Sequence, residues 1–136
     1  MAAFRLKWAI AMRIGYPCVN RTIGCSSSHT FRLASYSEAT LRKTVKANLD
    51  CLRRVLRFNV DHGIFFFRIT SDLVPFASHP VCRLKWQSEF KGEFASLGEV
   101  IKRNSMRISM HPDQFVLINA KDEGVFSKSV KDLEYH

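Results

Sequence analysis

Apolar positions follow two alternating patterns along the chain, and together they predict three successive strand–loop–helix units. Short apolar runs, typical of β-strands, lie at 13–16, 64–69 and 106–110. Each run is followed by a polar loop and then by a segment in which apolar residues recur every three or four positions, as on one face of an α-helix. We predict these helices at 35–62, at 86–103 and from residue 121 onward.

The first predicted helix has a start signal, an apolar stripe and a stop signal. Ser35 and Glu38 have the spacing of a capping box, in which side-chain oxygens accept hydrogen bonds from free backbone N–H groups. His62 and Gly63 form the expected stop, because glycine readily adopts the left-handed conformation that ends many helices. The stripe consists of Leu41, Val45, Leu49, Leu52, Leu56 and Val60. We expect the Lys and Arg residues on the other faces to form a solvated exterior rather than a nucleic-acid groove.

The second predicted strand, at 64–69, is apolar except for Arg68. A strand covered on both faces has this composition, which is typical of parallel sheets between helices. Parallel strands joined by helical crossovers wind right-handed, so the three loops that follow the strands emerge on one face. We therefore expect residues 16–20, 71–79 and 111–115 to converge.

The third strand ends at a His-Pro-Asp sequence, residues 111–113. Its proline, Pro112, lacks a backbone donor and favours an extended conformation in the residue before it. Gln114 and Phe115 follow at once, although a plain strand-to-loop turn needs neither an amide nor an aromatic ring. A second His-Pro pair, which begins at His79, lies in the loop after the second strand.

Neutral imidazole is a common metal ligand, so His79 and His111 at neighbouring strand ends are candidates to share a metal. Two ligands do not complete a catalytic site, which usually takes three protein ligands. The spacing leaves two interpretations open: metal ligation, and an ordinary polar residue at a strand end. For His29, His62 and His136 a surface position is the better default.

A complete (β/α)8 barrel gathers its catalytic residues at the carboxyl ends of its strands and needs about 250 residues. This chain of 136 residues supplies only three of the eight βα units. The predicted fold class is therefore α/β, a partial TIM (β/α)8-type barrel. Residues 12–136 form the N-terminal portion of that single domain, and residues 1–11 form an extension before it.

Charge and cysteine usage narrow the class of protein. The net charge of +9 and a pI of about 9.8 predict a polyanionic partner, with nucleic acid first and a membrane surface second. No apolar run approaches the roughly 20 residues of a membrane span, and Arg5 and Lys7 interrupt the N-terminal segment too early for a signal peptide. The four cysteines form no C-x-x-C pair, which predicts reduced thiols in a cytoplasmic protein rather than a zinc ribbon or a disulfide scaffold.

Four sequence runs, at 12–20, 30–34, 67–79 and 107–119, resemble those of UV-damage endonucleases and occur in the same order. The similarity covers nearly everything from Met12 onward and corresponds to the N-terminal part of that family's barrel, which is xylose-isomerase-like. The resemblance implies a TIM-like barrel that carries divalent metals, usually manganese. It also implies an enzyme, monomeric at full length, that nicks double-stranded DNA on the 5′ side of ultraviolet photoproducts and leaves 3′-hydroxyl and 5′-phosphate ends.

The same resemblance assigns roles to individual residues. His79 and His111 would be active-site histidines that bind the metal. Tyr16 and Asn20 would contact the damaged strand. Gln114 and Phe115 would probe the duplex at the lesion. Many family members carry tyrosine where this chain has Phe115, so the ring is kept and the hydroxyl group is lost.

The family's carboxylate ligands come from later strands, so we predict that this chain alone does not cleave irradiated DNA. Two other functions fit parts of the pattern. One is another metal-dependent barrel enzyme, such as a sugar isomerase, which also needs histidines at strand ends but gains nothing from the positive charge. The other is a non-catalytic DNA-binding module, which fits the charge and the missing carboxylates.

Overall fold

The computed structural model describes residues 13–136, so the predicted extension at 1–11 lies outside the described residues. Three parallel strands form one sheet in the order β1-β2-β3, with Gly15 beside Phe66 and Phe66 beside Arg107. The strands are β1 (Gly15–Pro17), β2 (Phe66–Ile69) and β3 (Arg107–Met110). The α-helices are α1 (Glu38–Asp61), α2 (Trp86–Glu89), α3 (Lys91–Arg103) and α4 (Glu123–Tyr135). The predicted α/β class and parallel sheet are confirmed.

The N-cap of helix α1 lies two residues later than predicted. The Ser37 hydroxyl accepts a hydrogen bond from the backbone N–H of Thr40 at 3.1 Å, so Ser37 and not Ser35 is the N-cap. Ser35 lies in a short 3-10 helix, η1 (Leu33–Ser35), where its hydroxyl caps nothing. The predicted stop is confirmed, since Gly63 has a left-handed φ of 69° directly after α1.

The helix predicted at 86–103 is broken in two at Phe90. Its φ of −101° and ψ of 19° depart from helical values and separate α2 from α3. Phe90 at the break and Leu97 in α3 are both buried in the core. The apolar periodicity runs through the break, which explains why the sequence pattern did not show it.

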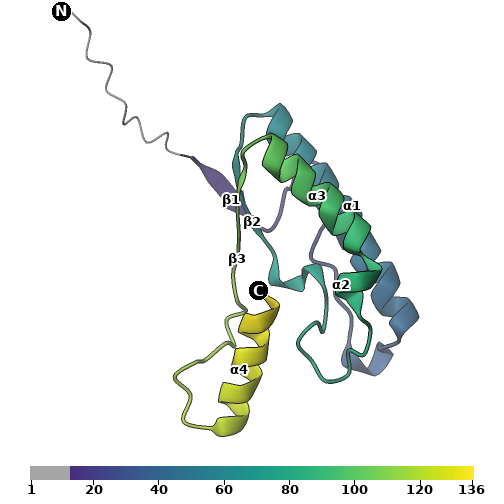
Figure 1. Cartoon of the computed structure of the whole chain (residues 1–136), viewed down its shortest axis with the longest axis vertical. Helices are drawn as coiled ribbons and strands as arrows, with labels where there is room; N and C mark the ends of the chain where they lie inside the picture. The colour runs from purple at the N-terminus through teal and green to yellow at the C-terminus, as the bar shows by residue number, and fades with distance from the viewer. Residues whose placement is uncertain (1–12) are drawn as a thin grey trace, which may run out of the picture.

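The helices cover one face of the sheet and leave the other open. Figure 1 shows α1 and α3 side by side against the same side of the three strands. Phe67 and Ile69 point into the core with the apolar stripe of α1, whereas Arg68 between them is exposed. Our expectation that the second strand is covered on both faces is therefore wrong for the described residues.

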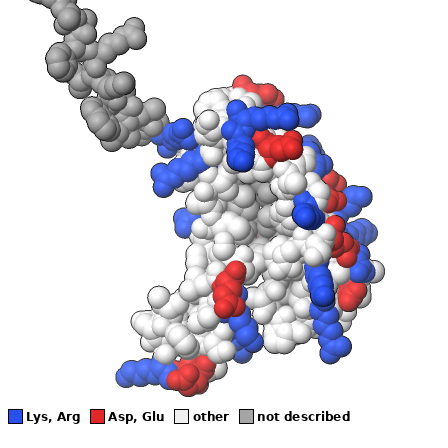
Figure 2. All heavy atoms as spheres, in the orientation of Figure 1, with Lys and Arg blue, Asp and Glu red and all other residues white. Residues whose placement is uncertain are grey.

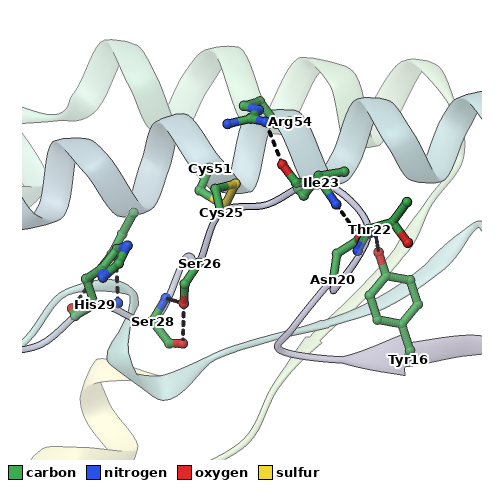
Figure 3. The surroundings of a disulfide bond; sticks show 11 residues. Tyr16, Asn20, Thr22, Ile23, Cys25, Ser26, Ser28, His29, Cys51 and Arg54 are labelled. Carbon is green, nitrogen blue, oxygen red and sulfur yellow. Dashed lines mark hydrogen bonds between the residues drawn. A yellow bond between two sulfur atoms is a disulfide. The ribbon is translucent and has the colours of Figure 1, made fainter.

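The expectation of four reduced thiols is also wrong. Cys25 and Cys51 form a disulfide, which fastens the long loop after β1 to the middle of α1 (Figure 3). Their separation of 26 residues gives no sequence signal, because it arises only when the loop folds back over the helix. Cys18 and Cys82 are free thiols. Among the described residues no helix is long and apolar enough to cross a membrane.

Candidate active site at the carboxyl ends of the strands

The three parallel strands end at the same edge of the sheet, and polar residues follow each of them. The register pairs Ile69 with Met110, so His111 begins its loop level with the end of β2. The predicted convergence of the three loops is thus confirmed at the level of the strand ends. We call Cys18, Asp72, His111 and Asp113 the strand-end cluster.

Cys18 and His111 are in contact although β2 lies between their strands. The Cys18 Sγ atom is 3.2 Å from Nε2 of His111. The backbone N–H of Cys18 donates to the carbonyl of Arg68 at 2.8 Å, which extends the pairing of β1 with β2 by one residue. Burial raises the pKa of the Cys18 thiol, and the nearby Arg68 guanidinium opposes that rise. The thiol is therefore protonated near neutral pH.

Asp72 links the second loop electrostatically to the third. Lost hydration raises the pKa of its carboxyl group, the Asp113 carboxylate adds to the rise, and His111 opposes it. Asp72 and Asp113 also line a small pocket of about 120 Å³ together with Asp132 and Tyr135. A larger cavity of about 680 Å³ lies at the opposite end of the strands, lined by residues such as Gly63 and Ser105. We place the site at the strand-end cluster, because Asp72 and Asp113 of that cluster line the smaller pocket, whereas no Asp, Glu, His or Cys among the described residues lines the larger cavity.

His79 and His111 follow the same ends of neighbouring strands, but their rings have separate contacts. His79 is exposed, and its Nδ1 accepts a hydrogen bond from the backbone N–H of Val81 at 3.1 Å. It also packs edge-on against Phe76 and borders a cavity of about 410 Å³ shared with Lys128. Among residues 13–136, no three His, Cys, Asp or Glu side chains are grouped closely enough to hold a metal ion.

Gln114 and Phe115 lie on the outside of the loop that follows β3. Phe115 has 73% of its surface exposed, so its ring contributes little to the core. The loop itself is held in place: the Leu117 backbone N–H donates to the hydroxyl of buried Ser129 on α4 at 2.9 Å. An anchored loop with an exposed ring is suited to contact a partner molecule.

Tyr16 and Asn20 lie on the helix-covered side, and their polar atoms are used within the protein. The Tyr16 hydroxyl donates to Oδ1 of Asn59 at 2.6 Å and accepts from Nδ2 of Asn20 at 2.7 Å. Oδ1 of buried Asn20 accepts from the backbone N–H of Thr22 at 2.8 Å (Figure 3). In the described structure these two residues shape the loop after β1, and their contact with DNA stays a prediction.

Two buried asparagines of α1, Asn48 and Asn59, also hold the site together and are not among the predicted site residues. Asn59 supports Tyr16, and Asn48 joins the loop after β1 to the loop after β2. Asn48 has no exposed surface; its Oδ1 accepts from the His29 N–H at 2.9 Å, and its Nδ2 faces the carbonyls of His29, Asp72 and Leu73 at 3.0–3.2 Å. Both residues stand among the apolar positions of a long helix. A polar amide at such a position in the sequence is a sign of a buried hydrogen-bonding role, because buried amides generally have hydrogen-bond partners.

The remaining histidines take no part in the strand-end cluster. His29 and His62 are exposed, as predicted, and the His62 ring stacks on Phe58. His136 is only half-exposed, and its Nδ1 contacts the carbonyl of Asp132 at 2.5 Å. The surface default is therefore correct for the first two and incomplete for His136.

Positive charge is spread over the outer helices and mixed with negative charge. Figure 2 shows Lys and Arg interleaved with Asp and Glu along the side formed by α1 and α3. Arg42 pairs with Glu38 at 3.0 Å and with Glu89 at 2.6 Å, and Arg53 pairs with Asp50 at 3.4 Å. This pattern agrees with the predicted solvated helix exterior.

Comparisons with known proteins point to a single family. Residues 12–136 match the model of the UV-endonuclease UvdE family. The chain is 40% identical over 125 residues to a UV DNA damage endonuclease of Clostridium perfringens, covering 92% of this chain and 30% of that protein. It is 39% identical over 99 residues to the enzyme of that name from Bacillus pumilus, covering 73% of this chain and 31% of the relative.

A solved structure, described as the crystal structure of SacUVDE, has the same architecture. It matches with a TM-score of 0.89 and 42% sequence identity, over 92% of this chain and 43% of the SacUVDE chain. The chain thus spans less than half the length of each of these three proteins. The family match covers every described residue, and the solved structure has the same fold at high sequence identity. This chain belongs to the UV-endonuclease UvdE family.

Proposed function

We propose that this chain is the N-terminal part of a TIM-type barrel enzyme that incises DNA on the 5′ side of ultraviolet photoproducts. The observation that carries the proposal is the family match over residues 12–136. The shared edge where the three strands end supports it, because barrel enzymes place their catalytic groups there. The proposed partner is double-stranded DNA that contains pyrimidine dimers.

Gln114 and Phe115 are proposed to probe the duplex at the lesion. A photodimer weakens local stacking and pairing, so the duplex bends and its bases turn out more easily than in intact DNA. The exposed ring of Phe115 can occupy the vacated stack, which is worth about 1–3 kcal/mol by comparison with other base–aromatic contacts. The Gln114 amide offers both a donor and an acceptor to an unpaired base.

Exposed Lys and Arg side chains are proposed to hold the DNA backbone. Contacts to phosphate position a duplex without reading its sequence, as recognition of damage by shape requires. The net charge of +9 supplies enough cations for such contacts. Binding of this kind weakens as salt concentration rises.

His79 and His111 are proposed as ligands of a divalent metal, with manganese as the expected ion. The described residues do not make a full metal site, because no three potential ligands converge. Hydrolysis assisted by a metal usually takes three protein ligands, so the missing ones must come from other parts of a complete barrel. We therefore assign no step of the hydrolysis to the residues described.

The proposal is tested with a chimera that joins residues 12–136 to the remainder of the SacUVDE barrel. We expect the chimera to nick ultraviolet-irradiated plasmid when Mn²⁺ is present, and the 136-residue chain alone to leave the plasmid intact. His111→Ala should abolish nicking by the chimera. Nicking by the chain alone, or full activity of the His111→Ala chimera, would contradict the proposed division of the site.

A separate comparison tests damage recognition. Phe115→Ala should reduce the preference of the chimera for irradiated over intact plasmid, whereas Phe126→Ala, which removes another exposed ring from α4, should not. The net charge also favours a second candidate, a non-catalytic DNA-binding module. That function predicts binding to the two plasmids with equal affinity and no effect of His111→Ala.

A further inference from the structure

Both ring nitrogens of His111 have a defined neighbour. Nδ1 lies 3.1 Å from the carbonyl oxygen of Pro112, and Nε2 lies 3.2 Å from Sγ of Cys18. A carbonyl oxygen can only accept a hydrogen bond, so the hydrogen of a neutral ring belongs on Nδ1. Nε2 then carries the lone pair, and the Cys18 thiol is its donor.

Cys18 has an unusual backbone conformation that brings its thiol to this ring. Its φ is 57°, in the left-handed region that residues with a Cβ atom seldom adopt. The Val19 N–H donates to the Pro17 carbonyl at 2.6 Å, which closes a tight turn around Cys18. The Cys18 N–H is bound to the Arg68 carbonyl, so the turn is also fixed to β2. Conformations of this kind persist where the surrounding structure determines them, and they cluster at functional sites.

We propose that Cys18 is a positioning residue for His111. Its thiol donates to Nε2 and, together with the Pro112 carbonyl at Nδ1, favours the Nδ1–H tautomer of the imidazole. A thiol is a weak hydrogen-bond donor, so the Nε2 lone pair can give up this contact when the neutral ring acts as a ligand or a base. The importance of this arrangement for catalysis rests on the proposed function, whereas the tautomer itself is a property of the chain as it stands.

The tautomer can be read from ¹⁵N chemical shifts of the imidazole in long-range ¹H–¹⁵N NMR spectra. The full chain would be studied at about pH 8, where an ordinary histidine is neutral. In the unaltered protein we expect His111 Nε2 to resonate as an unprotonated nitrogen. In Cys18→Ala the Nε2 resonance should shift toward the position of a protonated nitrogen, and Cys18→Ser should restore most of the original shift because a hydroxyl group also donates.

Two further variants separate the thiol from the backbone turn and from the general loss of a thiol. Cys18→Gly accepts a positive φ without strain, so it should fold and yet show the same shift as Cys18→Ala. Cys82→Ala removes the other free thiol and should leave His111 unchanged. An Nε2–H tautomer in the unaltered protein would overturn the proposal, as would an unchanged His111 in the Cys18→Ala or Cys18→Gly protein. None of these results depends on nuclease activity, so a failure here is distinct from a failure of the chimera to cut irradiated DNA.

Discussion

Asn48→Ala is expected to loosen two loops of the candidate site at once. The Asn48 side chain is fully buried and is the shared hydrogen-bond partner of His29 in the first loop and of Asp72 and Leu73 in the second. Alanine fits the same place in the helix but leaves one N–H group and several carbonyls without a partner. The loss therefore falls on the links between loops and helix and not on the formation of α1.

The size of the effect follows from the surroundings of each orphaned group. His29 is exposed, so water can replace much of the hydrogen bonding that its backbone loses. Leu73 is buried, so its carbonyl oxygen is left without a hydrogen-bond partner. An unsatisfied buried polar group costs about 1–3 kcal/mol, and each of the other lost bonds costs up to about 1 kcal/mol. We therefore expect Asn48→Ala to lower the free energy of unfolding by about 3 kcal/mol and the Tm by roughly 10 °C.

Urea denaturation followed by circular dichroism measures this loss, and hydrogen exchange of the His29 amide reports the loop directly. Asn104→Ala is the matched control, because that partly exposed side chain makes a single hydrogen bond to the Val100 carbonyl, at 2.8 Å. It should cost less than about 1 kcal/mol. Equal losses for the two variants, or unchanged exchange at His29, would refute the role given to Asn48.

Three more results are expected. Replacing both cysteines of the disulfide with serine should lower the free energy of unfolding by about 3.5 kcal/mol, because the bond joins positions 26 residues apart; a loss below about 1 kcal/mol in non-reducing urea denaturation would contradict this. Gly15→Ala should greatly reduce the Tm, because a Cβ atom at this position would lie 1.9 Å from the Phe66 carbonyl oxygen. Gly92→Ala is the control: a Cβ atom there meets no neighbouring atom, and alanine favours the helix, so the Tm should rise slightly. Burial raises the pKa of Tyr135 to about 12, so the unfolded chain loses this proton first and stability should fall as pH rises from 10 to 12. Absorbance titration checks this: Tyr135→Phe should remove a late phenolate signal, and ionisation of all three tyrosines near pH 10 would show the reasoning to be wrong.

The order of elements could be predicted from the sequence because it depends on local periodicity. The three strands and the parallel sheet follow from apolar spacing and crossover geometry, and the stop of α1 just before Gly63 follows from that glycine. The exact start of a helix is harder to predict, because neighbouring residues compete for the position of the N-cap. Ser35 and Ser37 both precede Glu38, and only the folded backbone shows that Ser37 caps the helix.

Contacts between distant segments left little or no trace in the sequence. The Cys25–Cys51 bond and the Cys18–His111 contact each join residues that chain folding alone brings together. Apolar residues of β2 also gave no indication of which face the helices cover, because a run of phenylalanines fits a strand with one covered face or two. Of the predicted site residues, the structure places His111 in the cluster, leaves His79 exposed beside Phe76, and turns Tyr16 toward α1.

The tight turns at the opposite end of the sheet offer a practical consequence. Gly63 and Ser105, both with positive φ, return the chain from α1 and α3 into β2 and β3, far along the strands from His111. A fluorescent label introduced beside either turn would lie at the opposite end of strand β3 from Gln114 and Phe115. It would therefore allow binding to irradiated duplexes to be followed by anisotropy without touching the surface that makes the contact.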